Sequence, residues 1–242
     1  LAMAGITPAH ANARREQADV YAAGSQRLLY REEHLVQPGA STERWVVYRC
    51  PDGKPFARKR VAAGGARPDF ALEDARDGYR EGVRGAGDAR QVYVGLAGKE
   101  TSRRVPVPAD GVIDAGFDAA VRTHWAQLMR GETVQLRFLV PSRKQFFPVQ
   151  LRRMGSADWN GIRAERLRMK LDTWFGFAVP EVTLVYARDG RRLLEFNGTG
   201  NLRDGRGRNP QVRIAFQPQA QLASASDLAD VARLPLDGRC SF

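Results

Sequence analysis

The sequence of 242 residues carries 38 Lys and Arg against 27 Asp and Glu, which gives a formal net charge of +11. Its 43% hydrophobic and 27% charged content exclude a disordered or fibrous chain. No apolar run approaches the roughly 20 residues that a membrane-spanning helix needs, so we expect a chain that is not integral to a membrane. The positive charge favours nucleic acid, anionic lipid head groups or acidic small molecules as partners, although codon bias toward Arg is an alternative explanation of it.

The first residues have the pattern of a secretory leader. Residues 1–11 are small and apolar and end in Ala9-His10-Ala11, and polar sequence follows at once. An A-x-A pattern of this kind is typical of a signal-peptide cleavage site. We therefore predict that residues 1–11 are the C-terminal part of a signal peptide and that the protein is periplasmic; an Ala-rich start with no targeting role is the alternative.

The first part of the remaining chain predicts an antiparallel meander. Residues 25–36, 43–50 and 55–62 are rich in β-branched and aromatic residues and are separated by turn segments. Residues 68–84, with a turn at Asp77-Gly78, and residues 90–97 continue the pattern. Pro106 and Pro108 are expected to interrupt the sheet, because proline cannot donate a hydrogen bond to a neighbouring strand.

One amphipathic helix is predicted over residues 115–130. Phe117, Val121, Trp125 and Leu128 form a single apolar stripe at helical spacing. Asp114 suits the N-cap and Gly131 suits the position just after the helix.

After the helix the alternation of period two returns, in strands expected at residues 133–140, 146–154, 162–171, 181–196 and 211–216. Within 162–171 the apolar positions change phase, which predicts a bulge in that strand. The tail beyond Pro218 is expected to place one short helix over a sheet edge. The predicted fold class is mainly β (α+β): a curled antiparallel sheet, or half-open β-barrel, with one central helix covering the concave face. Residues 12–242 would form this single domain, with two subdomains divided near Pro108 as the alternative.

The glycine-rich segment 197–210 invites comparison with phosphate and calcium loops. No helix follows it, as a phosphate loop requires, and it lacks the alternating acidic ligands of a calcium loop. We predict a strand end followed by a turn at Asp204-Gly205, which displays Arg203, Arg206 and Arg208 on one exposed loop tip.

No complete catalytic or metal-binding motif is present. G-x-S-x-G, H-E-x-x-H and C-x-x-C are all absent, and neither His34 nor His124 is near a Ser or Cys in sequence. The group Asp69, Glu73, Asp74 and Asp77 could supply two carboxylates, but with Arg76 and Arg80 nearby it is interpreted as a charge-balanced surface. The sequence predicts no enzyme activity, no metal and no cofactor. Cys50 and Cys240 could form one disulfide, which would need an oxidising compartment.

Basic and aromatic residues are interleaved in 142–153 and 163–177. Such segments suit a basic groove for single-stranded nucleic acid or a surface that contacts anionic membrane, and export would make nucleic acid the poorer partner. The cations expected at such a surface are Arg137, Arg143, Lys144, Arg152, Arg153, Arg163, Arg166, Arg203, Arg206 and Arg208.

The leader, the curled sheet, the central helix and the ending from Thr183 to Phe216 together resemble the periplasmic lipoprotein-carrier superfamily of LolA/LolB type. This resemblance implies a half-barrel that binds acyl chains or another hydrophobic or amphipathic anionic ligand under a helical lid. The residues expected to line the cavity are Trp125, Phe138, Trp159, Trp174, Phe175 and Phe177. The alternative function is a basic, non-enzymatic interaction module for anionic membrane or nucleic acid.

Overall fold

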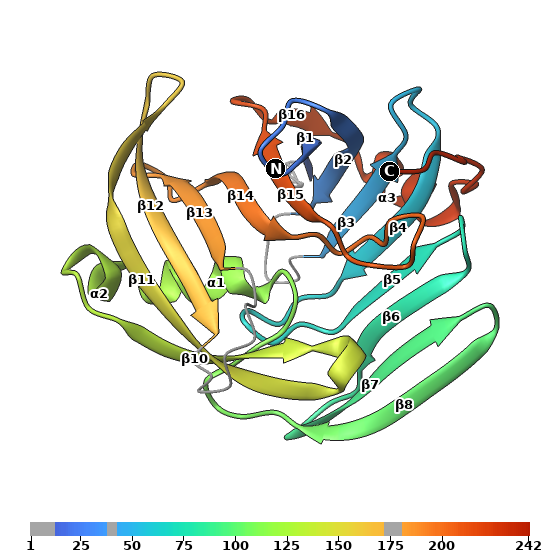
Figure 1. The fold of residues 1–242 in the computed structure, drawn as a ribbon, viewed down its shortest axis with the longest axis horizontal. Coiled ribbons are helices and arrows are strands. Elements are labelled where there is room, and N and C mark those ends of the chain that lie inside the picture. The colour runs from blue at the N-terminus through green and yellow to red at the C-terminus, as the bar shows by residue number, and fades with distance from the viewer. Residues whose placement is uncertain (1–12, 38–42, 172–180) are drawn as a thin grey trace, which may run out of the picture.

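The computed structural model describes residues 13–37, 43–171 and 181–242, and their strands form one large rolled sheet (Figure 1). The predicted fold class is confirmed: the sheet is open and antiparallel throughout, apart from one parallel pair, β9 with β10. The predicted leader at residues 1–11 lies outside the described residues. Among the described residues, no helix is long and apolar enough to cross a bilayer.

The first meander runs from the centre of the sheet to one edge, in the order β1 to β8. Local alternation predicted most of it correctly, but two strands were missed: β1, because half of its residues are charged or polar, and β8, because nearly all of its residues are exposed. The strands are β1 (Ala13–Ala22), β2 (Leu28–Val36), β3 (Arg44–Arg49), β4 (Pro55–Val61), β5 (Phe70–Asp74), β6 (Tyr79–Arg84), β7 (Ala89–Leu96) and β8 (Lys99–Pro106).

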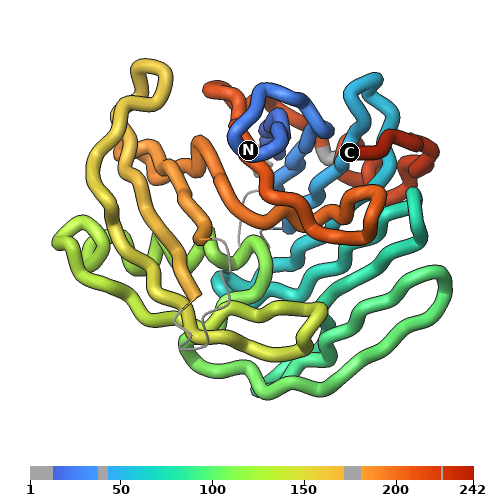
Figure 2. Tube along the Cα trace, in the orientation of Figure 1, coloured from blue at the N-terminus to red at the C-terminus, as the bar shows by residue number. Residues whose placement is uncertain are grey.

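The second meander returns from the other edge, β9, to the centre, where β15 pairs with β1. Figure 2 shows this junction as the blue first strand beside the orange-red trace of β15. The remaining strands are β9 (Gly111–Val112), β10 (Val134–Val140), β11 (Gln145–Trp159), β12 (Ile162–Leu171), β13 (Val182–Ala187), β14 (Leu193–Thr199), β15 (Gln211–Phe216) and the short β16 (Gln221–Ala223), which also pairs with β1.

Two apolar clusters fill the same face of this sheet, which we call the inner face. One cluster centres on Tyr30, Tyr48 and Phe56 of the first meander, and the other on Leu167 and Tyr186 of the second. The ring of Phe196 on β14 packs against both clusters, so both lie on one side of the sheet. The inner face is therefore filled by core side chains over much of the described sheet.

The predicted helix is present but divided into α1 (Gly116–Thr123) and α2 (Trp125–Met129), with the interruption at His124. Its apolar stripe is confirmed, because Val121, Trp125 and Leu128 are buried against the inner face. The predicted N-cap is wrong: Ala115 holds that position, and Asp114 adopts a left-handed backbone with φ of 44°. The Asp114 carboxylate instead pairs with the buried Lys59.

The bulge predicted in 162–171 is also misplaced. Ala164 packs in a cluster on the outer face, whereas Leu167 and Met169 lie on the inner face. The change of phase is thus a change in which face carries the apolar side chains. The register shift lies in the neighbouring strand β11, between Arg153 and Gly155.

The C-terminal tail covers the outer face and then returns to the core. Helix α3 (Ala225–Arg233) begins with a capping box between Ser224 and Asp227. It places Val231 against Leu35 and Val47, so it covers the outer face of β2 and β3 instead of the predicted sheet edge. Beyond it, Cys240 forms a disulfide with Cys50 across 190 residues of sequence, with a Cα–Cα distance of 5.6 Å. A structural disulfide is characteristic of an oxidising compartment.

Candidate functional site

The two ends of the rolled sheet meet at a seam beside β8. Pro106 ends β8, and Pro108 follows in the connection to β9. Proline has no amide hydrogen, so neither of these two residues can donate to a neighbouring strand. The Val107 N–H between them donates to the Asp88 carbonyl of the β6–β7 side at 2.8 Å. Among the described strands, β8 pairs only with β7 and has no partner across the seam.

The other side of the seam is the tip of the β10–β11 hairpin. A single 3-10 turn, η1 (Pro141–Arg143), and Lys144 in the left-handed conformation (φ of 50°) close this hairpin. The turn contacts β6 and β7, and Leu139 and Phe146 on either side of it pack in the first core cluster. The hairpin tip is therefore held against the inner face of the opposite end of the sheet.

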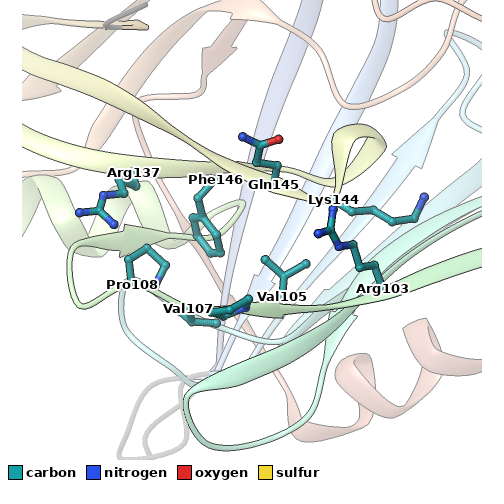
Figure 3. Close-up of a pocket in the computed structure, with 9 residues that line it drawn as sticks. Arg103, Val105, Val107, Pro108, Arg137, Lys144, Gln145 and Phe146 are labelled. Atoms are coloured by element: carbon teal, nitrogen blue, oxygen red, sulfur yellow. The ribbon is translucent and has the colours of Figure 1, made fainter.

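Between these two sides lies a pocket of about 600 Å³, which we call the seam pocket (Figure 3). Its floor is apolar: Val105 is buried, and Val107, Pro108 and Phe146 are half-buried. The full lining is Arg103, Val105, Pro106, Val107, Pro108, Arg137, Lys144, Gln145 and Phe146.

The charges around the floor are distributed unequally. Figure 3 shows Arg137 at one end of the pocket and both Arg103 and Lys144 at the other, with the Phe146 ring between the two ends and the Lys144 side chain extending away from that ring. Arg137 is neutralised by Asp110, whose Oδ2 lies 3.3 Å from its Nε. Within the described part of the chain, Arg103 and Lys144 have no carboxylate partner. One end of the seam pocket thus carries two uncompensated cations next to an apolar floor.

The cations that were predicted to form one surface for contact with anionic partners lie in separate places in the structure. Arg137 and Lys144 line the seam pocket, and Arg143 is exposed beside it. Arg152, Arg163 and Arg166 are exposed on β11 and β12, whereas Arg153 donates at 2.7 Å to the buried carboxylate of Glu165. Arg153 is therefore engaged in the core network and is a poor candidate for surface contact.

The glycine-rich loop contains the predicted turn, but the prediction for Arg203 is wrong. The Asp204 carboxylate accepts backbone hydrogen bonds from Arg206 and Arg208, at 2.8 and 2.9 Å, and these bonds lower its pKa. Arg203 turns inward: its guanidinium lies 3.4 Å from Asp77 and 4.8 Å from the ring centre of Tyr79. Only Arg206 and Arg208 extend from the exposed tip.

The aromatic residues predicted to line one cavity do not lie together. Trp125 and Phe138 pack in the inner-face cluster, with Trp125 edge-on to Tyr186. Trp159 lies on the outer face, where its indole N–H donates to Glu195 at 3.3 Å. Trp174, Phe175 and Phe177 lie outside the described residues.

Buried polar pairs occupy the inner face, and local sequence reasoning missed them. His34 Nε2 lies 2.8 Å from Glu32 Oε2, and both side chains are buried. Asp74, expected on a charged surface, is buried with Arg76, whose guanidinium lies between the rings of Phe56 and Phe242. The sequence did contain a signal for such a pair: Glu32 and His34 are two residues apart, and residues i and i+2 lie on the same face of a strand. Within the described residues, no three His, Cys, Asp or Glu side chains gather as metal ligands would.

The seam pocket has a comparable signal in sequence. Arg103, Val105 and Val107 alternate and so project to one side of an extended chain. Pro106 and Pro108 led us to predict an interruption instead of a strand, and for that reason this side of the pocket was not predicted.

Comparisons with known proteins identify the architecture. No family model matches the chain, and no curated protein matches it. A solved structure, a β-barrel-like protein of the domain of unknown function DUF1849 from Brucella abortus, is similar with a TM-score of 0.56 at 6% identity, over 88% of this chain and 98% of that one. This likeness shows a shared β-barrel-like fold.

A DUF1329 family protein from Desulfovibrio piger aligns over 93% of this chain and 91% of that one, with 11% identity and a TM-score of 0.30. Neither structure is described as a lipoprotein carrier, so the resemblance to that superfamily stays a prediction.

Proposed function

We propose that this protein is a non-enzymatic, periplasmic binding protein that holds an amphipathic anionic ligand in the seam pocket. The observation that carries the proposal is the pairing of two uncompensated cations, Arg103 and Lys144, with the apolar floor of Val105, Val107 and Phe146. An anionic head group would contact the cations, and an apolar chain would lie along the floor.

The energetics favour a ligand with both parts. Covering apolar surface stabilises a complex by about 25 cal/mol per Å². The two cations already lie near low-dielectric surface, where an opposite charge is attracted more strongly than in bulk water. A pocket of about 600 Å³ is also within the usual size range of small-molecule sites.

Two independent features support a periplasmic location. The Cys50–Cys240 disulfide favours an oxidising environment. The A-x-A pattern at residues 9–11 favours export. Cell fractionation should recover the protein from the periplasm, processed near Ala11; an unprocessed cytoplasmic protein would contradict this part of the proposal.

The site differs from that of the carriers the sequence resembles. A carrier of the LolA/LolB type is expected to hold its ligand on the concave face, but here core side chains fill much of the described inner face. We therefore propose binding at the seam, where β8 and the β10–β11 hairpin leave an opening.

Displacement of a dansyl-labelled fatty acid tests the proposal. The wild-type protein should bind the probe, and Arg103→Gln together with Lys144→Gln should weaken binding at least about tenfold, which is 1.4 kcal/mol. Arg104→Gln is the matched control, because Arg104 is the next residue of the same exposed strand but does not line the pocket. Equal affinity for all three proteins, or no binding at all, would refute the site.

A second candidate function is electrostatic contact with an anionic membrane. Arg143, Arg152 and Arg166 are exposed, and none of them forms an ion pair with another described residue. Such binding to phosphatidylglycerol vesicles should weaken steeply as salt rises, because exposed charges are screened. Vesicle binding that is insensitive to salt would contradict it.

A further inference from the structure

We infer that the head group held at the cationic end of the seam pocket is a phosphomonoester. This inference rests on the proposed function and makes its ligand class specific. It follows from the number of free cations at that end, from their types and from the different elements that carry them.

The charge of the site matches a dianion. Arg103 and Lys144 contribute two positive charges, and Asp110 neutralises the third cation, Arg137, at the opposite end. A carboxylate or a sulfate ester carries one negative charge at neutral pH and would leave one cation uncompensated. A phosphomonoester carries about −1.5 to −2 at pH 7, because its second pKa is near 6.

The two donor types also suit phosphate. A guanidinium presents a planar fork that engages two oxygens at once, whereas an ammonium group acts as a compact point charge. A carboxylate engaged by the fork of Arg103 already accepts one hydrogen bond at each of its two oxygens, so Lys144 would have to share an oxygen with the guanidinium. A phosphomonoester has three terminal oxygens, so one remains for Lys144.

The position of the two cations gives the bound ligand a structural effect. Arg103 lies on β8, and Lys144 lies at the tip of the β10–β11 hairpin. No backbone ladder joins these two elements within the described part of the sheet. A dianion between the cations would therefore link the two ends of the rolled sheet and raise the melting temperature.

Isothermal titration calorimetry with three probes that share one tail tests the head group. Dodecyl phosphate, dodecyl sulfate and dodecanoate are compared below their micelle concentrations at pH 7.5, with inorganic phosphate as a fourth probe. We expect dodecyl phosphate to bind at least about tenfold more tightly than the other two alkyl probes. We also expect its advantage to shrink as the pH falls below about 6, where phosphate takes up its second proton, while dodecyl sulfate is unaffected.

The outcomes separate this inference from the proposed function. Equal binding of the three alkyl probes would overturn the phosphomonoester and leave the amphipathic site standing. Inorganic phosphate that binds as tightly as dodecyl phosphate would keep the phosphate site and refute the role of the tail. Absence of binding by every probe would refute both.

Substitutions assign the preference to the two cations. Arg103→Lys keeps the charge but removes the fork, and Lys144→Gln removes one charge; each should reduce the preference for dodecyl phosphate over dodecyl sulfate several-fold. Arg104→Gln changes the net charge by the same amount as Lys144→Gln and should leave the ratio of the two affinities unchanged. A ratio that falls equally in Arg104→Gln would show a general charge effect and would overturn the assignment.

Discussion

Lys59 and Asp114 form a buried ion pair that joins β4 to the start of α1, with 2.8 Å between Lys59 Nζ and Asp114 Oδ2. Their side chains are 7% and 9% exposed. Removal of one partner of such a pair leaves an uncompensated charge in the interior, at a cost of about 3–5 kcal/mol. We predict that Lys59→Met lowers the free energy of unfolding by this amount, as measured by urea denaturation. Lys54→Met, in the exposed β3–β4 turn, is the control and should change it by less than about 0.5 kcal/mol.

Glu81 should make stability depend on pH. Burial raises the pKa of its carboxyl from 4.5 to about 7, and the nearby Asp114 adds to the rise, while a 2.8 Å hydrogen bond from Tyr79 and the charge of Lys59 oppose it. The folded state thus holds this proton more tightly than the unfolded chain. Its contribution to stability is complete below pH 4.5 and is lost as the pH rises to about 7.

Glu81→Gln removes this titration. Relative to the wild type, the variant should gain about 2 kcal/mol of stability between pH 5 and pH 8, measured by thermal or urea unfolding at both values. Glu100→Gln, at an exposed ion pair with Arg84, should show no such trend. A difference between Glu81→Gln and wild type that is the same at both pH values would contradict the prediction.

The Cys50–Cys240 disulfide should account for a large share of the stability. It closes a loop of 190 residues and holds the tail that places Phe242 against Arg76. Loss of a disulfide typically costs about 2–5 kcal/mol. We predict that reduction lowers the melting temperature of the wild type, and that the Cys50→Ala/Cys240→Ala variant melts at the lower temperature whether or not a reductant is present. A wild type whose melting is unaffected by full reduction would argue against this role.

Gly82 should not tolerate a side chain. A Cβ at this position would collide with the carbonyl oxygen of Phe70 and with the hydroxyl of Tyr93, whose ring lies over the glycine. Gly82→Ala should therefore destabilise the protein by about 1–3 kcal/mol in urea denaturation. Gly205→Ala, where a Cβ would meet nothing within 4 Å, is the matched control. Equal effects of the two substitutions would show that steric crowding is not the cause.

Local patterns were enough to predict most of the sheet and the apolar stripe of the helix. The alternation in β5, for example, follows directly from one buried and one wet face. β1 was missed because it is held partly by β15, a strand distant in sequence, and half of its own residues are charged or polar. β8 was missed because it pairs with a single neighbour, β7, and its residues are largely polar. Such pairings are not encoded in any short window.

Only some of the cations that line the seam pocket were named from the sequence. Arg137 and Lys144 were expected to contact an anion, because cations and aromatic residues are interleaved around the β10–β11 turn. Arg103 was not expected, since only the rolling of the sheet brings β8 to that turn. The prediction of one aromatic cavity was not reproduced for a related reason. Residue type alone does not indicate that Trp159 lies on the outer face of the sheet while Trp125 packs in an inner-face cluster.

The position of β1 between β2 and β15 also has a consequence for how the chain folds. The first described strand remains half-paired until the residues up to Phe216 are available. The two meanders can each form early through neighbouring hairpins, but their union requires contact between opposite ends of the sequence, which makes folding slow. Until then β1 presents an open strand edge, which is a hazard for aggregation. A chaperone that shields this edge during synthesis would protect the whole protein.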